Sequence, residues 1–111
     1  WNATEAGINA AKPGVTTFDI FNTMNQIIAE RNAVGNNVGR LGHGLGLQLT
    51  EPPSHRPGDN TIIKENMVLT IEPGMEYAKG KMIVHEENVV IHKDGAELIT
   101  KRAPKEIPII K

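Results

Sequence analysis

The sequence has no cysteine, few aromatic residues, almost no net charge and no long apolar run. Without cysteine it can form neither disulfide bonds nor thiolate metal sites, which fits a reducing compartment, and we expect a cytoplasmic location. A formal net charge of −1 gives no basic surface for nucleic acid or an anionic membrane. No segment approaches the roughly 18 apolar residues that a membrane span needs. With 111 residues, we expect one domain with a modest aliphatic core.

Two amphipathic helices are predicted in the first third of the chain. Residues 1–11 are rich in alanine and are followed by Pro13-Gly14, so they predict a helix that packs closely against a neighbour. A capping box of Thr16 and Asp19 begins the second helix, which Gly35 is predicted to end. Because the chain starts inside a helical pattern and without methionine, we expect it to be a piece of a longer protein.

From residue 42 onward the apolar residues alternate with a period of two, which indicates strands. Turns are expected at Lys79-Gly80 and Lys93-Asp94-Gly95, and the three prolines within residues 51–60 predict a loop. The chain is expected to end in an extended tail that lies along a neighbour. The predicted strands cover residues 47–50, 68–72, 81–92 and 96–100. Two helices followed by strands favour an α+β fold.

His43 lies between two glycines in the segment 42–50, GHGLGLQLT. Glycine leaves the backbone free and adds no side chain, so we predict open space around the imidazole for a ligand. A phosphate-binding loop would need Lys-Ser or Lys-Thr after its last glycine, and a dinucleotide-binding loop would need a helix there. Neither pattern follows His43, which argues against both.

Glu72 and Glu86 each lie in a predicted strand with apolar neighbours. A buried carboxylate needs a cation, a set of donors or a metal ion, because the charge is otherwise costly. With His43, the two glutamates form a set of one imidazole and two carboxylates that suits Mn, Fe, Co or Zn. Exposed glutamates and a structural histidine are the alternative, and spacing alone leaves both open.

Three segments closely resemble, in sequence and in order, motifs of the pita-bread metallopeptidases, which include methionine aminopeptidase, Xaa-Pro aminopeptidase, prolidase and creatinase. Residues 11–15 (AKPGV) are also similar to the turn between the helices of that family. The resemblance implies that residues 1–111 are the C-terminal portion of a pita-bread catalytic domain, with two helices followed by a curved, mostly antiparallel sheet. The three segments are residues 42–52 (GHGLGLQLTEP), 67–75 (MVLTIEPGM) and 85–100 (HEENVVIHKDGAELIT).

By this resemblance, His43 and Glu72 bind one metal ion of a dinuclear centre, and Glu86 bridges both ions. Glu72 would also act as the general acid/base in hydrolysis of N-terminal peptide bonds of the Xaa-Pro type. The implied cofactors are two divalent ions, Mn, Co, Fe or Zn. The two aspartate ligands of the family would lie upstream of residue 1, so we expect an incomplete site and an inactive isolated chain.

Two positions depart from the family pattern. Thr50 stands where the peptidases carry a histidine, and Val84 stands where Xaa-Pro enzymes often carry an arginine. Thr50 is therefore a candidate substrate-binding residue; His55 could substitute for the missing histidine, although a solvated loop position is the favoured interpretation. These changes keep open a lyase or small-amide hydrolase of the same fold, similar to dimethylsulfoniopropionate lyase or creatinase. A non-catalytic binding module of this fold is a third reading.

The substrate is thus expected to be a peptide or a small amide, with no nucleic acid and no membrane as partner. Half of a curved sheet would expose an edge and an apolar face, so association into a homodimer is also expected.

Overall fold

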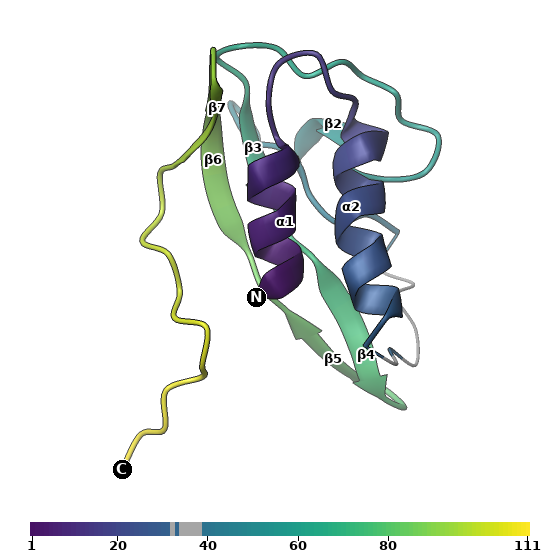
Figure 1. The fold of residues 1–111 in the computed structure, drawn as a ribbon, viewed down its shortest axis with the longest axis vertical. Helices are drawn as coiled ribbons and strands as arrows, with labels where there is room; N and C mark the ends of the chain where they lie inside the picture. Colours follow the sequence, from purple (N-terminus) through teal and green to yellow (C-terminus); the bar gives the residue numbers. More distant parts are fainter. Residues whose placement is uncertain (32, 34–38) are drawn as a thin grey trace.

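The computed structural model describes residues 1–31, 33 and 39–111, and it places two helices on one face of an antiparallel sheet (Figure 1). The helices are α1 (Asn2–Ala10) and α2 (Thr17–Ala29). The main sheet has the strand order β2-β1-β3-β6-β7, and β4 and β5 form a separate hairpin. The predicted α+β fold, two helices followed by a mostly antiparallel sheet, is confirmed. The strands are β1 (His43–Gly44), β2 (Glu51–Ser54), β3 (Val68–Ile71), β4 (Gly74–Ala78), β5 (Lys81–Val84), β6 (Glu87–His92) and β7 (Gly95–Leu98).

The predicted capping box at the start of α2 is present. The Thr16 hydroxyl accepts a hydrogen bond from the Asp19 N–H at 3.1 Å, and the Asp19 carboxylate accepts one from the Thr16 N–H at 2.8 Å. The Thr16 N–H and the Thr16 hydroxyl both donate to the Asp19 carboxylate and lower its pKa, because they stabilise its charged form. The helix ends at Ala29, and Gly35, its predicted end, lies outside the described residues.

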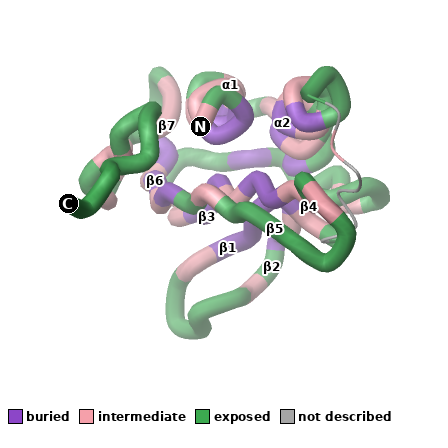
Figure 2. The backbone as a smooth tube through the Cα atoms, turned by 90° about the horizontal axis from the view of Figure 1, so that it is seen from below, coloured by how far each residue is buried: buried purple, intermediate pink, exposed green. Residues whose placement is uncertain are grey.

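The core lies between the helices and the main sheet, where Figure 2 shows their buried segments facing each other. Close packing of α1 is achieved at Gly7, where a Cβ would stand 2.7 Å from side-chain atoms of both Ile71 and Met24. The core side chains come from both layers: Ala3, Ala11, Ile20, Met24, Ile28, Leu41, Ile63, Leu69, Ile71, Val89 and Ile91. No helix in the described part of the chain is both long and apolar enough to cross a membrane.

Two predictions around the glycine-rich segment are wrong. Residues 47–50, predicted as a strand, form an exposed loop, and Leu47 and Leu49 face outward without packing partners to hold a strand there. Residues 51–54, predicted as part of a loop, form β2 despite Pro52 and Pro53. The prolines are tolerated because β2 pairs only with β1 and is an edge strand, so one side needs no backbone donors.

The predicted strand over residues 81–92 is interrupted at His85 and Glu86. Its first part, β5, pairs with β4, whereas its second part, β6, pairs with β3 in the main sheet. The His85 N–H donates to the Pro73 carbonyl oxygen at 3.1 Å where the chain passes between the two sheets. Side-chain alternation therefore does not continue through this point, which matters for the two glutamates at 86 and 87.

The chain after β7 begins against α1 and then extends away from the body of the protein (Figure 1). The Trp1 indole N–H donates to the Ala103 carbonyl oxygen at 2.9 Å, and the Arg102 guanidinium stacks over the Trp1 ring at 4.3 Å from its centroid. The predicted extended tail is present, and its first residues do lie along a neighbouring helix.

Candidate metal centre

His43 is held in an inner strand of the sheet, β1, by its own backbone. Its N–H donates to the Thr70 hydroxyl at 3.0 Å, and β1 lies between β2 and β3. The ring Nδ1 lies 2.8 Å from the Gly44 carbonyl oxygen. Because a carbonyl oxygen only accepts hydrogen bonds, Nδ1 must carry the proton, and in the neutral ring Nε2 keeps its lone pair. The local backbone thus prepares Nε2 to act as a metal ligand.

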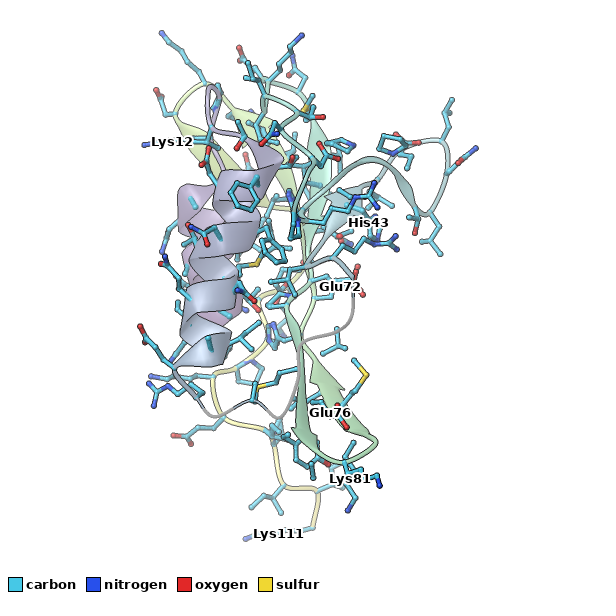
Figure 3. The ribbon with its side chains drawn as sticks, turned by 90° about the vertical axis from the view of Figure 1, so that its right-hand side faces the viewer. Lys12, His43, Glu72, Glu76, Lys81 and Lys111 are labelled. Atoms are coloured by element: carbon cyan, nitrogen blue, oxygen red, sulfur yellow. The ribbon has the colours of Figure 1, made fainter. Side chains whose placement is uncertain are left out.

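Glu72 follows β3 directly and faces His43. Its backbone N–H donates to the Leu41 carbonyl oxygen at 3.0 Å, which ties the end of β3 to the segment that leads into β1. Its Oε2 lies 3.5 Å from His43 Nε2, and Figure 3 shows both side chains on the side of the sheet away from the helices. The structure therefore brings these two predicted ligands together.

The spacing of this pair fits a shared cation. A carboxylate oxygen and an imidazole lone pair do not attract each other, and a proton or a metal ion between them would turn this contact into a favourable one. Two ligand atoms that each lie about 2.1 Å from one metal ion, at a tetrahedral angle, are about 3.4 Å apart. The observed 3.5 Å between Nε2 and Oε2 is close to that value, so both residues fit one metal ion.

Glu86 reaches the same cleft without completing a ligand set. The cleft has a volume of about 280 Å³ and is lined by His43, Thr50, Glu72 and Glu86, among others. Glu86 itself is exposed, since it lies at the crossing between β5 and β6. Within the described residues, no three histidine, cysteine, aspartate or glutamate side chains are grouped closely enough to hold a metal ion.

Thr50 is exposed at the rim of this cleft, as a substrate-binding residue would be. His55 lies elsewhere, and its interpretation as a solvated loop residue is wrong. It is fully buried next to Gly42 and does not line the cleft. Burial lowers the pKa of His55 to about 4, although the backbone of Thr17 and Thr70 favours the charged ring. Neither ring nitrogen has a hydrogen-bond partner of good geometry among the described residues.

The glycines around His43 do not open space for a ligand, contrary to the prediction. A Cβ on Gly42 would overlap the Thr70 carbonyl oxygen and the His55 ring, and a Cβ on Gly44 would overlap the Pro52 carbonyl oxygen. Gly42 also has a φ of +141°, which other residues rarely adopt. These glycines are needed because neighbouring backbone lies where their side chains would be.

The buried carboxylate of this region is Glu87, which the sequence analysis missed. Its side chain is 2% exposed, whereas Glu86, which was predicted to lie among apolar residues, is exposed. Burial raises the pKa of Glu87, but hydrogen bonds from Ala103, Thr100 and Arg102 outweigh burial, so the net pKa is lowered. Glu87 shares the helix-facing side of β6 with Val89 and Ile91. Because side chains alternate along a strand, the apolar residues Val89 and Ile91 could have indicated that Glu87 lies on the buried face.

Comparison with known proteins shows the family and the fold of this chain. Residues 1–93 match metallopeptidase family M24. The chain is 37% identical over 99 residues to the Xaa-Pro dipeptidase of Pyrococcus furiosus, a match that covers 89% of this chain and 28% of the relative. The prolidase of Pyrococcus horikoshii OT3 superposes with a TM-score of 0.86 at 34% identity, covering 96% of this chain and 30% of that structure. The Xaa-Pro dipeptidase of Bacillus anthracis gives a TM-score of 0.88 at 28% identity, covering 98% and 30%. The chain thus spans about 30% of the length of these relatives.

Proposed function

Because the chain belongs to metallopeptidase family M24, we propose that residues 1–111 are the C-terminal portion of the catalytic domain of a dipeptidase of the Xaa-Pro type. The observation that carries this proposal is the 3.5 Å separation of His43 Nε2 and Glu72 Oε2 at a cleft that Glu86 also lines. Relatives named Xaa-Pro dipeptidase and prolidase support the substrate class.

His43 and Glu72 would hold one divalent ion, and Glu86 would bridge it to a second. One imidazole with two carboxylates suits Mn, Co, Fe or Zn. The remaining ligands are proposed to come from outside residues 1–111, since the chain spans about 30% of its relatives. The 111 residues alone are therefore proposed to bind metal weakly and to be inactive. A cytoplasmic location and a homodimer stay predictions.

When bound, divalent ions would activate a water molecule and polarise the carbonyl group of the scissile bond. The chain supplies the groups that position and move protons. The Glu72 carboxylate would accept a proton from the attacking water and deliver it to the leaving amine. The His43 Nδ1–H would keep donating its hydrogen bond to the Gly44 carbonyl oxygen, which keeps the ring in one orientation. Thr50 would donate a hydrogen bond to the substrate from the cleft rim.

A lyase or small-amide hydrolase of the same fold is the second candidate. Thr50 lines the cleft and Val84 lines the hollow beside it, so both departures from the peptidase pattern lie where a substrate would bind. A panel of dipeptides and small zwitterionic amides, with product analysis, separates the two candidates. Cleavage of dipeptides alone would reject the second. A non-catalytic role is disfavoured because His43, Glu72 and Glu86 are all retained.

The direct test uses the full-length protein. Wild type, Glu86→Gln and the control Glu65→Gln are loaded with Mn²⁺, and hydrolysis of Ala-Pro and bound metal are measured. Glu65 is exposed and precedes β3, whereas Glu72 follows the other end of that strand, so its change should leave both values unaltered. Glu86→Gln should lose most activity and some metal. Equal activity of Glu86→Gln and wild type would reject the proposal.

A further inference from the structure

Glu86 lies on a short crossing that the strand pairing of neither sheet holds. The pairing of β5 with β4 ends at Val84, and the pairing of β6 with β3 begins at Glu87. His85 and Glu86 lie between these two points. The Glu86 carboxylate forms no hydrogen bond or ion pair within the described part of the chain. Its place at the cleft is therefore set by the residues on either side of it.

His85, directly before Glu86, is held at both its backbone and its ring. Its N–H donates to the Pro73 carbonyl oxygen at 3.1 Å, and Pro73 directly follows Glu72. A hydrogen bond of 2.9 Å joins the ring Nδ1 to the hydroxyl of Thr4. The other ring nitrogen, Nε2, is buried and has no partner among the described residues. The bond to Thr4 is therefore the one hydrogen bond that orients this ring within the described structure.

Thr4 makes this bond from the helix side of the sheet. It is fully buried in α1, which lies on the face opposite His43 and Glu72 (Figure 3). A buried hydroxyl is costly unless it is hydrogen-bonded, and His85 is its side-chain partner. The bond thus ties the crossing to a helix in the core, at the residue directly before Glu86.

Glu87, directly after Glu86, is also connected to α1. Its carboxylate accepts a hydrogen bond from the Arg102 guanidinium at 3.2 Å. The same guanidinium pairs with Glu5 of α1 at 3.1 Å. Thr4 and Glu5, two adjacent residues of α1, thus reach the two neighbours of Glu86. One reaches its neighbour directly, and the other does so through Arg102.

We propose that Thr4 is a positioning residue for the metal centre, because through His85 it holds Glu86 where that carboxylate can bridge the two proposed ions. This inference rests on the proposed role of Glu86. A bridging carboxylate must present two oxygen atoms to two ions at once, so a small shift of its backbone weakens binding. Residues that hold a ligand in place typically contribute roughly 10- to 100-fold to metal affinity.

The test measures the Mn²⁺ affinity of the full-length protein by isothermal titration calorimetry. Thr4→Val keeps the shape of the side chain and removes the hydroxyl, so it should weaken Mn²⁺ binding roughly 10-fold. Thr4→Ser keeps the hydroxyl and should bind Mn²⁺ as wild type does. The matched control is Thr17→Val, since Thr17 is equally buried but its hydroxyl donates to the Asp59 carbonyl oxygen at 2.7 Å. That variant should keep the wild-type affinity.

A second variant removes the same hydrogen bond from its other end. His85→Phe keeps a ring and should weaken Mn²⁺ binding to a similar extent as Thr4→Val. If Thr4 acts through His85, the double variant should bind Mn²⁺ no more weakly than His85→Phe alone. Urea unfolding of the metal-free variants measures their fold stability separately from metal binding.

Wild-type Mn²⁺ affinity in Thr4→Val or in His85→Phe would overturn the inference and leave the proposed function standing. An equal loss of affinity in Thr17→Val would also overturn it, because lost stability alone would then explain both variants. Glu86→Gln is the reference for loss of the bridging ligand and should bind Mn²⁺ at least as weakly as Thr4→Val. Wild-type affinity in Glu86→Gln would overturn both the inference and the proposed function.

Discussion

His43 Nε2 and Glu72 Oε2 lie 3.5 Å apart, although His43 belongs to β1 and Glu72 directly follows β3. Two backbone contacts set this distance. Thr70 accepts the His43 N–H, and the Leu41 carbonyl oxygen accepts the Glu72 N–H. The proposed ligands are therefore positioned by sheet hydrogen bonding, and changes to that bonding should be measurable.

Thr70→Val should destabilise the fold by about 1–3 kcal/mol, because it leaves the buried His43 N–H without an acceptor. Thr70→Ser is the matched control, since it keeps the hydroxyl and removes one methyl group. Urea unfolding gives the free energy of unfolding of each variant. A valine variant as stable as the serine variant would contradict the assigned role of the hydroxyl.

Gly42→Ala should be much more costly than Gly58→Ala. Both glycines have positive φ values, +141° and +86°, so both changes strain the backbone. Only at Gly42 would the new Cβ overlap other atoms, those of Thr70 and His55; at Gly58 nothing lies within 4 Å. We expect a loss of roughly 1 kcal/mol at Gly58 and at least about 3 kcal/mol at Gly42. Equal losses in thermal unfolding would show that packing at Gly42 is not tight.

Arg102→Ala should destabilise the protein by about 3–5 kcal/mol, because it leaves the Glu87 carboxylate, 2% exposed, without its cation. The control is Glu97→Ala, which breaks the His92–Glu97 pair at 2.7 Å, with side chains 51% and 68% exposed. That exposed pair should contribute less than about 1 kcal/mol. Urea unfolding measures both losses of stability. Losses of similar size in the two variants would refute the claim that the buried pair contributes more to stability than the exposed pair.

The stability of the protein should fall as pH decreases from about 6.5 to 4. Burial lowers the folded pKa of His55 to about 4, so in this range the unfolded chain binds the proton and the folded protein does not. Compared with pH values below 4, the folded state gains roughly 3 kcal/mol from this difference in the pKa of His55, and the gain is complete above pH 6.5. The pKa of His85 is also lowered, mainly by burial, and it acts with the same sign.

His55→Phe keeps a ring at this buried position and removes its titration. Its free energy of unfolding should therefore change less between pH 6.5 and 4 than that of wild type. His92→Gln, at an exposed position, is the control and should keep the wild-type pH dependence. A phenylalanine variant with the full wild-type pH dependence would show that His55 is not the group responsible.

Local signals were sufficient for much of this fold. The capping box of Thr16 and Asp19, the apolar spacing of α2 and the turn at Lys93-Asp94-Gly95 depend only on residues near one another in sequence. The strand predicted over residues 68–72 ended with Glu72 just before Pro73-Gly74, and β3 ends one residue earlier, at Ile71. These features could be predicted because each depends on short-range hydrogen bonding or on the local pattern of apolar residues.

The rest depends on pairing between distant segments. Pro52 and Pro53 are compatible with β2 only because it is an edge strand, which no local pattern shows. Glu86, expected among apolar residues, is exposed because the chain changes sheets just before β6, and Glu87 is buried instead. The burial of His55 and the tight packing at Gly42 arise from one contact across the sheet, between residues that the sequence gives no reason to pair.

Metal binding by the full-length protein tests the central claim most directly. Wild type, His43→Ala and His92→Ala are reconstituted with Mn²⁺, and bound metal per chain is measured by mass spectrometry after removal of free ions. His92 also faces a glutamate, at 2.7 Å, but on the exposed surface. We predict that His43→Ala holds less metal than wild type and that His92→Ala holds the same amount. A His43→Ala variant that retains the wild-type metal content would contradict the account.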